Sequence, residues 1–191
     1  ENTASVVSSH NAAGQIKIPR IVEMNGKQFR VTSIAPNAFL RNSQIMSIDL
    51  PDDSEVTTIG VAAFAFSSIL RLTIPASVTH IGEGILSGAI QLTEIIVSPQ
   101  NTHVTYYKNK LLICDNVLIY GSRLKKSFTI PSNVIEIAKY AFDYHAKLTK
   151  IAFKQDSQLK KIGLNAFEGC SALKEITIPS SVNSIGSCAF Q

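Results

Sequence analysis

The stretch IPSSVNSIGSCAF, residues 178–190, decides the fold, because close copies of it occur earlier in the chain. IPSNVIEIAKYAF occupies residues 130–142, and IPASVTHIGEGIL occupies residues 74–86. The three copies share their apolar positions and differ mainly at their polar positions. This pattern is typical of a repeat protein, in which each unit presents the same inward surface to the next unit.

Two short phrases alternate along the chain. The first is Ile-x-x-x-Ala-Phe, with copies that begin at Ile34, Ile59, Ile137, Ile162 and Ile185 and a degenerate copy at Ile81. The second is apolar-x-x-apolar-x-apolar, and its central apolar residues are Ile48, Leu72, Ile95, Phe128, Ile151 and Ile176. These central residues are separated by 24, 23, 33, 23 and 25 residues. The period is therefore about 23 residues, with one insertion of about ten residues.

The repeat predicts coils that are unstable alone. The apolar-x-apolar pattern is that of a strand with one face inward, and the proline that often follows it ends the pairing because it lacks an N–H donor. The last coil offers six large inward residues: Leu173, Ile176, Ile178, Val182, Ile185 and Phe190. Their burial contributes about 10 kcal/mol, which is less than the cost of ordering the coil. We therefore predict a solenoid of about seven coils, mostly β and loop, with short parallel strands and short helical turns on its convex side.

Two segments interrupt the period and are predicted to be β-hairpins. Residues 18–34 contain Asn25-Gly26 between apolar residues, which is a strong hairpin signal, and we expect this hairpin to cap the first coil. Residues 105–122 contain two apolar runs around Asp115-Asn116 and account for the longest gap. We expect residues 1–15 to be mobile and residues 16–191 to form a single domain.

The two ends of the chain suggest a piece of a longer repeat array. The first residue is Glu rather than Met, and Gln191 follows Phe190 in the middle of a repeat phrase. We expect that a leader was removed or that the domain was excised, and that the array is truncated at the C-terminus.

Charge and cysteine content restrict the classes of function. The chain has 18 Lys plus Arg against 14 Asp plus Glu, with a net charge of +4, and the excess lies in the second half. A basic half can attract sulfated glycans or simply be a solvated face, and we predict no nucleic-acid partner. The three cysteines Cys114, Cys170 and Cys188 favour neither a disulfide framework nor a zinc site, and we expect Cys170 and Cys188 to be buried.

No motif in the sequence indicates an enzyme. The four histidines, His10, His80, His103 and His145, are scattered over unrelated repeat positions, and no phosphate-binding or nucleophile motif is present. We therefore predict no catalytic residue, no metal, no cofactor and no membrane insertion in this chain.

The full repeat, Leu-x-x-Ile-x-Ile-Pro-x-x-Val-x-x-Ile-Gly-x-x-Ala-Phe, resembles the BspA-like, treponeme-type leucine-rich repeats over about residues 16–190. YYKNKLLICDNVLIYGS, residues 106–122, also resembles a hairpin insertion of that family. Ile85-Leu86 departs from the pattern, because it stands where the family has Ala-Phe. The resemblance implies a leucine-rich-repeat solenoid of a cell-surface or secreted protein of mucosal bacteria or parasitic protists. It also implies cell adhesion and protein binding in a host–pathogen setting, with no catalytic residues to carry over.

The outward residues of successive strands form the main candidate binding surface, because strands of a solenoid align in columns about 4.8 Å apart. One predicted column is Ser47, Arg71, Glu94, Ser127, Lys150 and Glu175, and the next is Asp49, Thr73, Ile96, Thr129, Ala152 and Thr177. A second candidate is the inserted hairpin with Tyr106, Tyr107 and Tyr120, whose rings could meet a partner or cover the hairpin's base.

Three functions remain open at this point. The first is adhesion to a host extracellular-matrix or cell-surface protein. The second is lectin-like binding of sulfated glycans by the basic residues Arg123, Lys125, Lys126, Lys147, Lys150, Lys154, Lys160 and Lys161. The third is self-association as a homodimer through a hairpin or a terminal coil.

Overall fold

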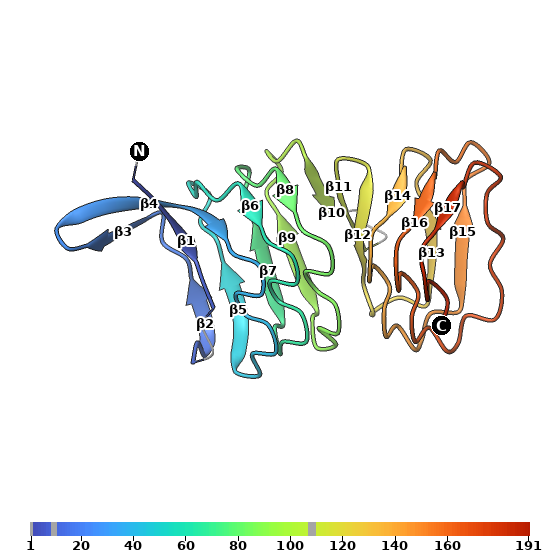
Figure 1. Cartoon of the computed structure of the whole chain (residues 1–191), viewed down its shortest axis with the longest axis horizontal. Coiled ribbons are helices and arrows are strands. Elements are labelled where there is room, and N and C mark those ends of the chain that lie inside the picture. Colours follow the sequence, from blue (N-terminus) through green and yellow to red (C-terminus); the bar gives the residue numbers. More distant parts are fainter. Residues whose placement is uncertain (1, 9–10, 107–109) are drawn as a thin grey trace. The chain divides into compact units, whose positions relative to one another are not determined.

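The structure is a computed structural model that describes residues 2–8, 11–106 and 110–191 in two compact units, Glu1–Thr105 and Tyr106–Gln191. Each unit is a β-solenoid whose short parallel strands are joined by turns (Figure 1). Each has four coils, so the chain has about eight in total, where about seven were expected. The prediction of a repeat solenoid is confirmed, and whether the two units act as one domain stays a prediction.

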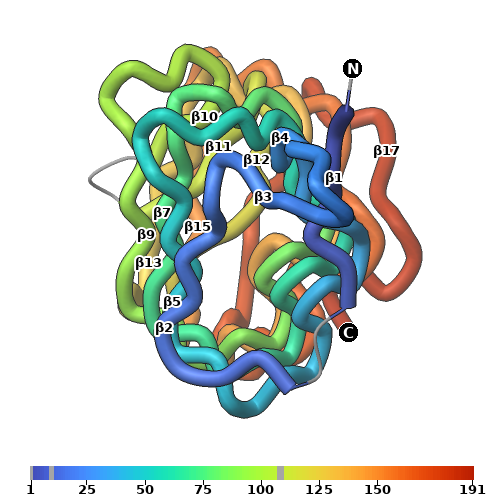
Figure 2. Tube along the Cα trace, turned by 90° about the vertical axis from the view of Figure 1, so that its left-hand side faces the viewer, coloured from blue at the N-terminus to red at the C-terminus, as the bar shows by residue number. Residues whose placement is uncertain are grey.

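Two parallel ladders build the first unit. One ladder has the order β1 (Thr3–Val6), β4 (Lys27–Ile34), β6 (Thr58–Ile59), β8 (His80–Ile81). The other has the order β2 (Gly14–Lys17), β5 (Ile45–Asp49), β7 (Arg71–Ile74), β9 (Glu94–Val97). The strands of this second ladder follow one another along one wall of the unit (Figure 2).

The second unit repeats this plan. Its longer ladder contains β11 (Leu111–Cys114), β12 (Val117–Gly121), β14 (Glu136–Ile137), β16 (Lys161–Ile162) and β17 (Ser184–Ile185). Its shorter ladder pairs β13 (Ser127–Ile130) with β15 (Lys150–Phe153). Strand β10 (Val104–Tyr106) spans the boundary between the units. The inserted hairpin is confirmed, since β11 and β12 are antiparallel around Asp115-Asn116.

Matching repeat positions lie directly above one another. Ile34 pairs with Ile59 and Ile59 with Ile81 in one ladder, while Leu72 pairs with Ile48 and Ile95 in the other. The repeated phenylalanines stack in the same way. The rings of Phe39 and Phe64 have centroids 5.6 Å apart, and Phe142, Phe167 and Phe190 form a stack with spacings of 5.0 and 5.2 Å. The apolar period in the sequence is therefore the vertical repeat of the core.

The expected helical turns are turn segments, and no helix is present among the described residues. The reason is visible in the hydrogen bonds of residues 35–42. The N–H groups of Asn37, Phe39 and Arg41 donate to carbonyls of the next coil at 3.0, 2.7 and 2.8 Å. The N–H groups in between donate three residues back, as Leu40 does to Asn37. Because alternate donors bond across coils, the i to i−4 bonds of an α-helix cannot form.

The first residues of the chain lie in strands, whereas a mobile segment was expected over residues 1–15. Thr3–Val6 pairs in parallel with β4, and Gly14–Lys17 pairs in parallel with β5. These two strands form the first coil. Residues 9 and 10 lie outside the described residues.

The hairpin over residues 18–34 is present, but it does not cap the first coil. β3 (Ile21–Met24) pairs antiparallel with β4 around Asn25-Gly26, while β1 pairs in parallel with the same β4. The hairpin thus branches out from the second coil, and in Figure 1 it projects away from the rest of its unit. The expected position was wrong because the polar residues 1–17 add a coil that the repeat pattern does not mark.

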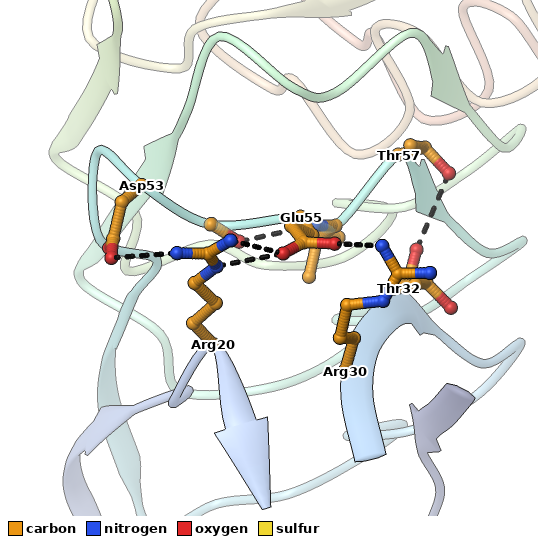
Figure 3. A network of polar contacts seen from close by, with 8 residues as sticks. Arg20, Arg30, Thr32, Asp53, Glu55 and Thr57 are labelled. Carbon is orange, nitrogen blue, oxygen red and sulfur yellow. Dashed lines mark hydrogen bonds and ion pairs between the residues drawn. The ribbon is translucent and has the colours of Figure 1, made fainter. Parts of the chain in front are cut away.

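An arginine–carboxylate cluster fixes the base of this hairpin (Figure 3). Arg20 donates to Glu55 through Nη2 at 2.7 Å and through Nε at 2.8 Å. Arg30 donates to the other Glu55 oxygen at 3.0 Å, and Asp53 lies 4.0 Å from Arg20. The two arginines hold the pKa of the Glu55 carboxyl below its ordinary value, with the Arg20 hydrogen bond as the main cause. Glu55 therefore links both strands of the hairpin to the next coil.

Candidate functional site

The predicted columns are present in the first unit on the outer face of the ladder β2–β5–β7–β9. Ser47 lies beside Arg71, which lies beside Glu94, and Thr73 lies beside Ile96. Inward residues such as Leu72 are buried while Arg71 and Glu94 are exposed. The strands thus place alternate side chains on a fixed outer grid, as expected from the sequence.

Three charged side chains form a row across this face. The Arg71 guanidinium lies between two carboxylates, with Nη2 3.5 Å from Asp49 Oδ1 and Nε 3.6 Å from Glu94 Oε2. The side chains of Arg71 and Glu94 are 45% and 56% exposed. Exposed ion pairs at such distances contribute about 0–1 kcal/mol to stability. A partner can therefore replace one of these contacts with its own at little cost in stability.

An exposed apolar residue adjoins this charged row. Ile96 is 41% exposed and lies on β9, two residues from Glu94 and opposite Thr73. A charged row beside an isoleucine on a rigid sheet combines directional and apolar contacts, which is the make-up of protein-binding surfaces.

Two predicted residues of this face serve the fold instead. Ser47 is only 5% exposed, and its hydroxyl donates to Asp49 at 3.5 Å. The Thr73 hydroxyl accepts from the Leu50 N–H at 2.7 Å, and it lies 3.3 Å from the Leu50 carbonyl and 3.4 Å from the Ile48 carbonyl. Thr73 therefore joins two coils where the ladder ends. The candidate surface of this unit is reduced to Asp49, Arg71, Glu94 and Ile96, which we call the sheet-face row.

The second unit contains only part of the predicted columns. Ser127 pairs with Lys150 and Thr129 with Ala152 across β13 and β15. Glu175 and Thr177 lie outside any strand, so the column stops at β15. An open groove of about 430 Å³ lies where the next strand would pair, and its lining includes Lys150, Lys154, Thr177, Ser180 and Ser181. We call it the β15 groove.

Not all of the predicted basic residues are surface cations. The side chain of Arg123 is only 11% exposed, and it donates to the Asp143 carboxylate at 3.0 Å and to the Asp143 carbonyl. Lys161 pairs with Glu136 at 2.8 Å. Lys125, Lys126, Lys147, Lys150, Lys154 and Lys160 are exposed. The basic surface therefore lacks Arg123, whose charge is neutralised inside the unit.

The tyrosines of the inserted hairpin do not form an exposed aromatic surface. Tyr120 is 2% exposed, and Arg123 lies over its ring at 5.7 Å. Tyr106 is half-buried with Lys110 over its ring at 5.4 Å, and burial raises the pKa of its hydroxyl to about 12. Tyr107 lies outside the described residues. Tyr120 offers no surface to a partner, because its strand is buried on both sides.

A buried polar cluster in the second unit was not expected from the sequence. Asp143 and His145 are each 1% exposed, and His145 Nε2 lies 3.1 Å from the Ser122 carbonyl. Burial lowers the pKa of His145 and raises the pKa of the Cys170 thiol to about 11. His145 lies three residues after the repeat phenylalanine Phe142, at the position that Asn42, Ser67 and Cys170 occupy in other coils.

The cysteines are free thiols, and only part of the prediction holds. Cys114 and Cys170 are buried, but Cys188 is exposed. Cys188 has a φ of 54°, and the equivalent Asn165 also has a φ of 54°. Within residues 2–8, 11–106 and 110–191, no group of three His, Cys, Asp or Glu side chains could hold a metal ion. The same ranges contain no helix that is long and apolar enough to cross a membrane.

The comparison with known families identifies the class. A profile of the BspA type leucine rich repeat region matches residues 20–117 and 108–191, in six copies. The chain therefore belongs to the BspA-type leucine-rich repeat family, and the resemblance seen in the sequence is confirmed. Among curated proteins, none matches this sequence.

One solved leucine-rich repeat structure shows the same fold, and two others have lower TM-scores. A leucine-rich repeat protein from Eubacterium ventriosum has a TM-score of 0.61 and 26% identity, over 92% of this chain and 58% of that protein. The chain thus spans little more than half the length of that relative. The pneumococcal vaccine antigen PcpA has a TM-score of 0.45 and 18% identity, over 95% of this chain and 70% of that one. A leucine rich cell surface protein from Faecalibacterium prausnitzii has a TM-score of 0.41 and 17% identity, over 97% of this chain and 90% of that one.

Proposed function

We propose that the chain is a protein-binding repeat module of a cell-surface or secreted protein, and that it attaches to host matrix or host-cell proteins. Membership of the BspA-type family supports a binding role. The observation that carries the proposal is the sheet-face row, where Arg71 and Glu94 are exposed beside Ile96 on a rigid ladder.

The chemistry of the row suggests how a partner is held. Arg71 is already aligned between Asp49 and Glu94 at 3.5 and 3.6 Å, so the three side chains are held in place and lose little entropy when a partner's cation approaches the two carboxylates. Ile96 supplies the apolar contact that excludes water from those charges. Because two carboxylates outnumber one guanidinium, the row favours a protein partner with a basic and an apolar side chain close together.

Binding of the purified chain to immobilised matrix proteins and to epithelial cells tests this proposal. Ile96→Glu should lower affinity about tenfold or more if the row is the contact. Ile90→Glu is the matched control, because Ile90 is 67% exposed but lies in a turn outside the ladder. Saturable binding that Ile96→Glu weakens and Ile90→Glu leaves unchanged supports the proposal. Equal affinities for both variants would place the contact elsewhere, and no binding to any surface would reject adhesion for this chain.

A second candidate function is the binding of sulfated glycans in the β15 groove. Lys150 and Lys154 line it together with Thr177 and Ser180, so cations and hydroxyls converge on one hollow. Sulfate groups are bound by this combination, and the affinity should fall as salt screens the lysines. Retention on heparin should be lost in Lys150→Gln/Lys154→Gln and kept in Lys147→Gln/Lys174→Gln, which removes two other lysines of the same unit. Equal retention of both double variants would assign heparin binding to net charge alone.

A further inference from the structure

The β3–β4 hairpin presents an unpaired strand edge. Within the part of the chain that the structure describes, β3 pairs only with β4. Asn25 and Gly26 form the two-residue turn with φ values of 54° and 70°, which keep the two strands in tight register. The hairpin points away from the other ladders of its unit (Figure 1). The outer edge of β3 thus has no strand partner among the described residues.

The register shows which backbone groups lie on that edge. Met24 pairs with Lys27 across the turn, Val22 pairs with Phe29, and the Val31 N–H donates to the Arg20 carbonyl at 2.8 Å. In an antiparallel pair, hydrogen-bonded and non-bonded residues alternate. Arg20, Val22 and Met24 therefore bond toward β4, and the N–H and C=O groups of Ile21 and Glu23 point outward.

This edge is complementary to itself. When two β3 edges run antiparallel with Val22 opposite Val22 of the second copy, each Ile21 lies opposite Glu23 of the other copy. The outward groups of these residues then form four backbone hydrogen bonds. Val22 and Phe29 share one face of the hairpin. The same register therefore creates a continuous apolar row across the four strands, made of Phe29 and Val22 of one copy followed by Val22 and Phe29 of the second copy.

We propose that the β3 edge pairs antiparallel with the β3 edge of a second copy of this chain, centred on Val22. The result is a four-stranded sheet that joins two solenoids through their hairpins. A two-stranded ribbon is marginal on its own, and two added strands give it the neighbours that a stable sheet needs. Ile21 and Met24, which are 43% and 59% exposed in the single chain, become partly covered in the pair.

Two further features favour this contact. The hairpin is held at its base by Glu55, which contacts Arg20 and Arg30, so the edge is ordered before association (Figure 3). The strand IVEM also lacks the lysines and prolines that often protect an exposed edge from pairing. Its one charge, Glu23, lies opposite Ile21 rather than opposite Glu23 of the second copy, so direct carboxylate repulsion is avoided.

Sedimentation velocity over a wide range of concentrations tests the contact, with two variants of one residue. Glu23→Pro removes the outward N–H and leaves the hairpin bonds intact, and it should abolish the dimer. Glu23→Ala keeps the backbone edge and removes a diagonal carboxylate pair, so it should dimerise as well as the wild type or better. A wild type that stays monomeric, or a dimer that survives Glu23→Pro, would overturn the proposal.

Cysteine cross-linking tests the register independently of how well Glu23→Pro folds. In a Cys188→Ser background, Val22→Cys should form an intermolecular disulfide, because non-bonded pairs place their Cα atoms about 4.5 Å apart. Met24→Cys is the matched control, because its Cα and that of its copy lie about 14 Å apart in this register. Equal cross-linking of the two variants, or none with Val22→Cys, would reject the Val22-centred pairing.

Discussion

Gly60 lies in direct backbone contact with Pro36 of the preceding coil. A Cβ atom on Gly60 would stand 2.4 Å from the Pro36 nitrogen, and one on Gly163 would stand 2.6 Å from the Lys139 nitrogen. The contact is fixed because the Gly60 N–H donates to the Ile34 carbonyl at 2.8 Å. The coils therefore meet backbone to backbone at this corner, which explains the Ile-Gly pair in the repeat.

Gly60→Ala should lower the free energy of unfolding by about 1–3 kcal/mol, because the added methyl group forces two coils apart. Urea unfolding followed by circular dichroism measures the loss. Val61→Ala is the control, since Val61 is 51% exposed and its truncation should change stability by less than about 0.5 kcal/mol. A Gly60→Ala protein as stable as Val61→Ala would mean that the coils have room to separate here.

Phe167→Ala should destabilise the second unit by about 3–5 kcal/mol, because it removes a ring from the middle of a buried stack. Phe167 is 1% exposed and lies 5.0 Å from the Phe142 ring and 5.2 Å from the Phe190 ring. Phe190→Ala should cost much less, since Phe190 is 44% exposed and stacks at the end of the row, on Phe167. Thermal unfolding of both variants gives the comparison, and equal losses would contradict a core centred on the stack.

The repeat core could be predicted from sequence because a single physical rule governs it. Every coil must match its neighbours, so the residues that stack, such as Ile34 on Ile59, recur at a fixed period. That period can be read directly from the sequence. The same rule located the first-unit columns, since Arg71 lies beside Glu94 as the register required. The hairpin turns at Asn25-Gly26 and Asp115-Asn116 were found for a different reason, because local turn chemistry specifies them.

What the sequence did not reveal depends on contacts that occur once. Asn42 accepts from the Gln44 and Ile45 N–H groups and donates to the Ala12 carbonyl at 2.9 Å, which ties the unexpected first coil to the second. The position recurs three residues after each repeat phenylalanine, but the residue type there changes from coil to coil, as Ser67, His145 and Cys170 show. Ser47 and Tyr120 were predicted to be binding residues on the surface, but both are buried. The sequence pattern does not show which outward positions neighbouring segments cover. The column was expected to continue to Glu175 and Thr177, but that segment does not pair with β15 although it repeats the strand pattern.

Glu55→Gln should lower the melting temperature at neutral pH and leave it nearly unchanged at a pH below the folded pKa of Glu55. The folded pKa of Glu55 lies below its ordinary value, mainly through the Arg20 hydrogen bond, so the carboxylate stabilises the fold when ionised. That stabilisation is present above the unfolded pKa, near 4.5, and is lost as the pH falls through the folded value. Calorimetry of the wild type and Glu55→Gln across this pH range measures the difference between their melting temperatures. A difference that persists at low pH would show that the contact does not depend on the Glu55 charge.

Arg123→Met should destabilise the second unit by about 3–5 kcal/mol, because it leaves the Asp143 carboxylate buried without its cation. The two side chains are 11% and 1% exposed and lie 3.0 Å apart, so water cannot replace the guanidinium freely. The double variant Arg123→Met/Asp143→Leu should be more stable than the single one, because it removes the stranded charge together with its partner. Lys125→Met is the control for losing a cation, since Lys125 is exposed two residues away. Chemical unfolding of the four proteins completes the test, and a double variant less stable than Arg123→Met would show that Asp143 is held by its other contacts rather than by Arg123.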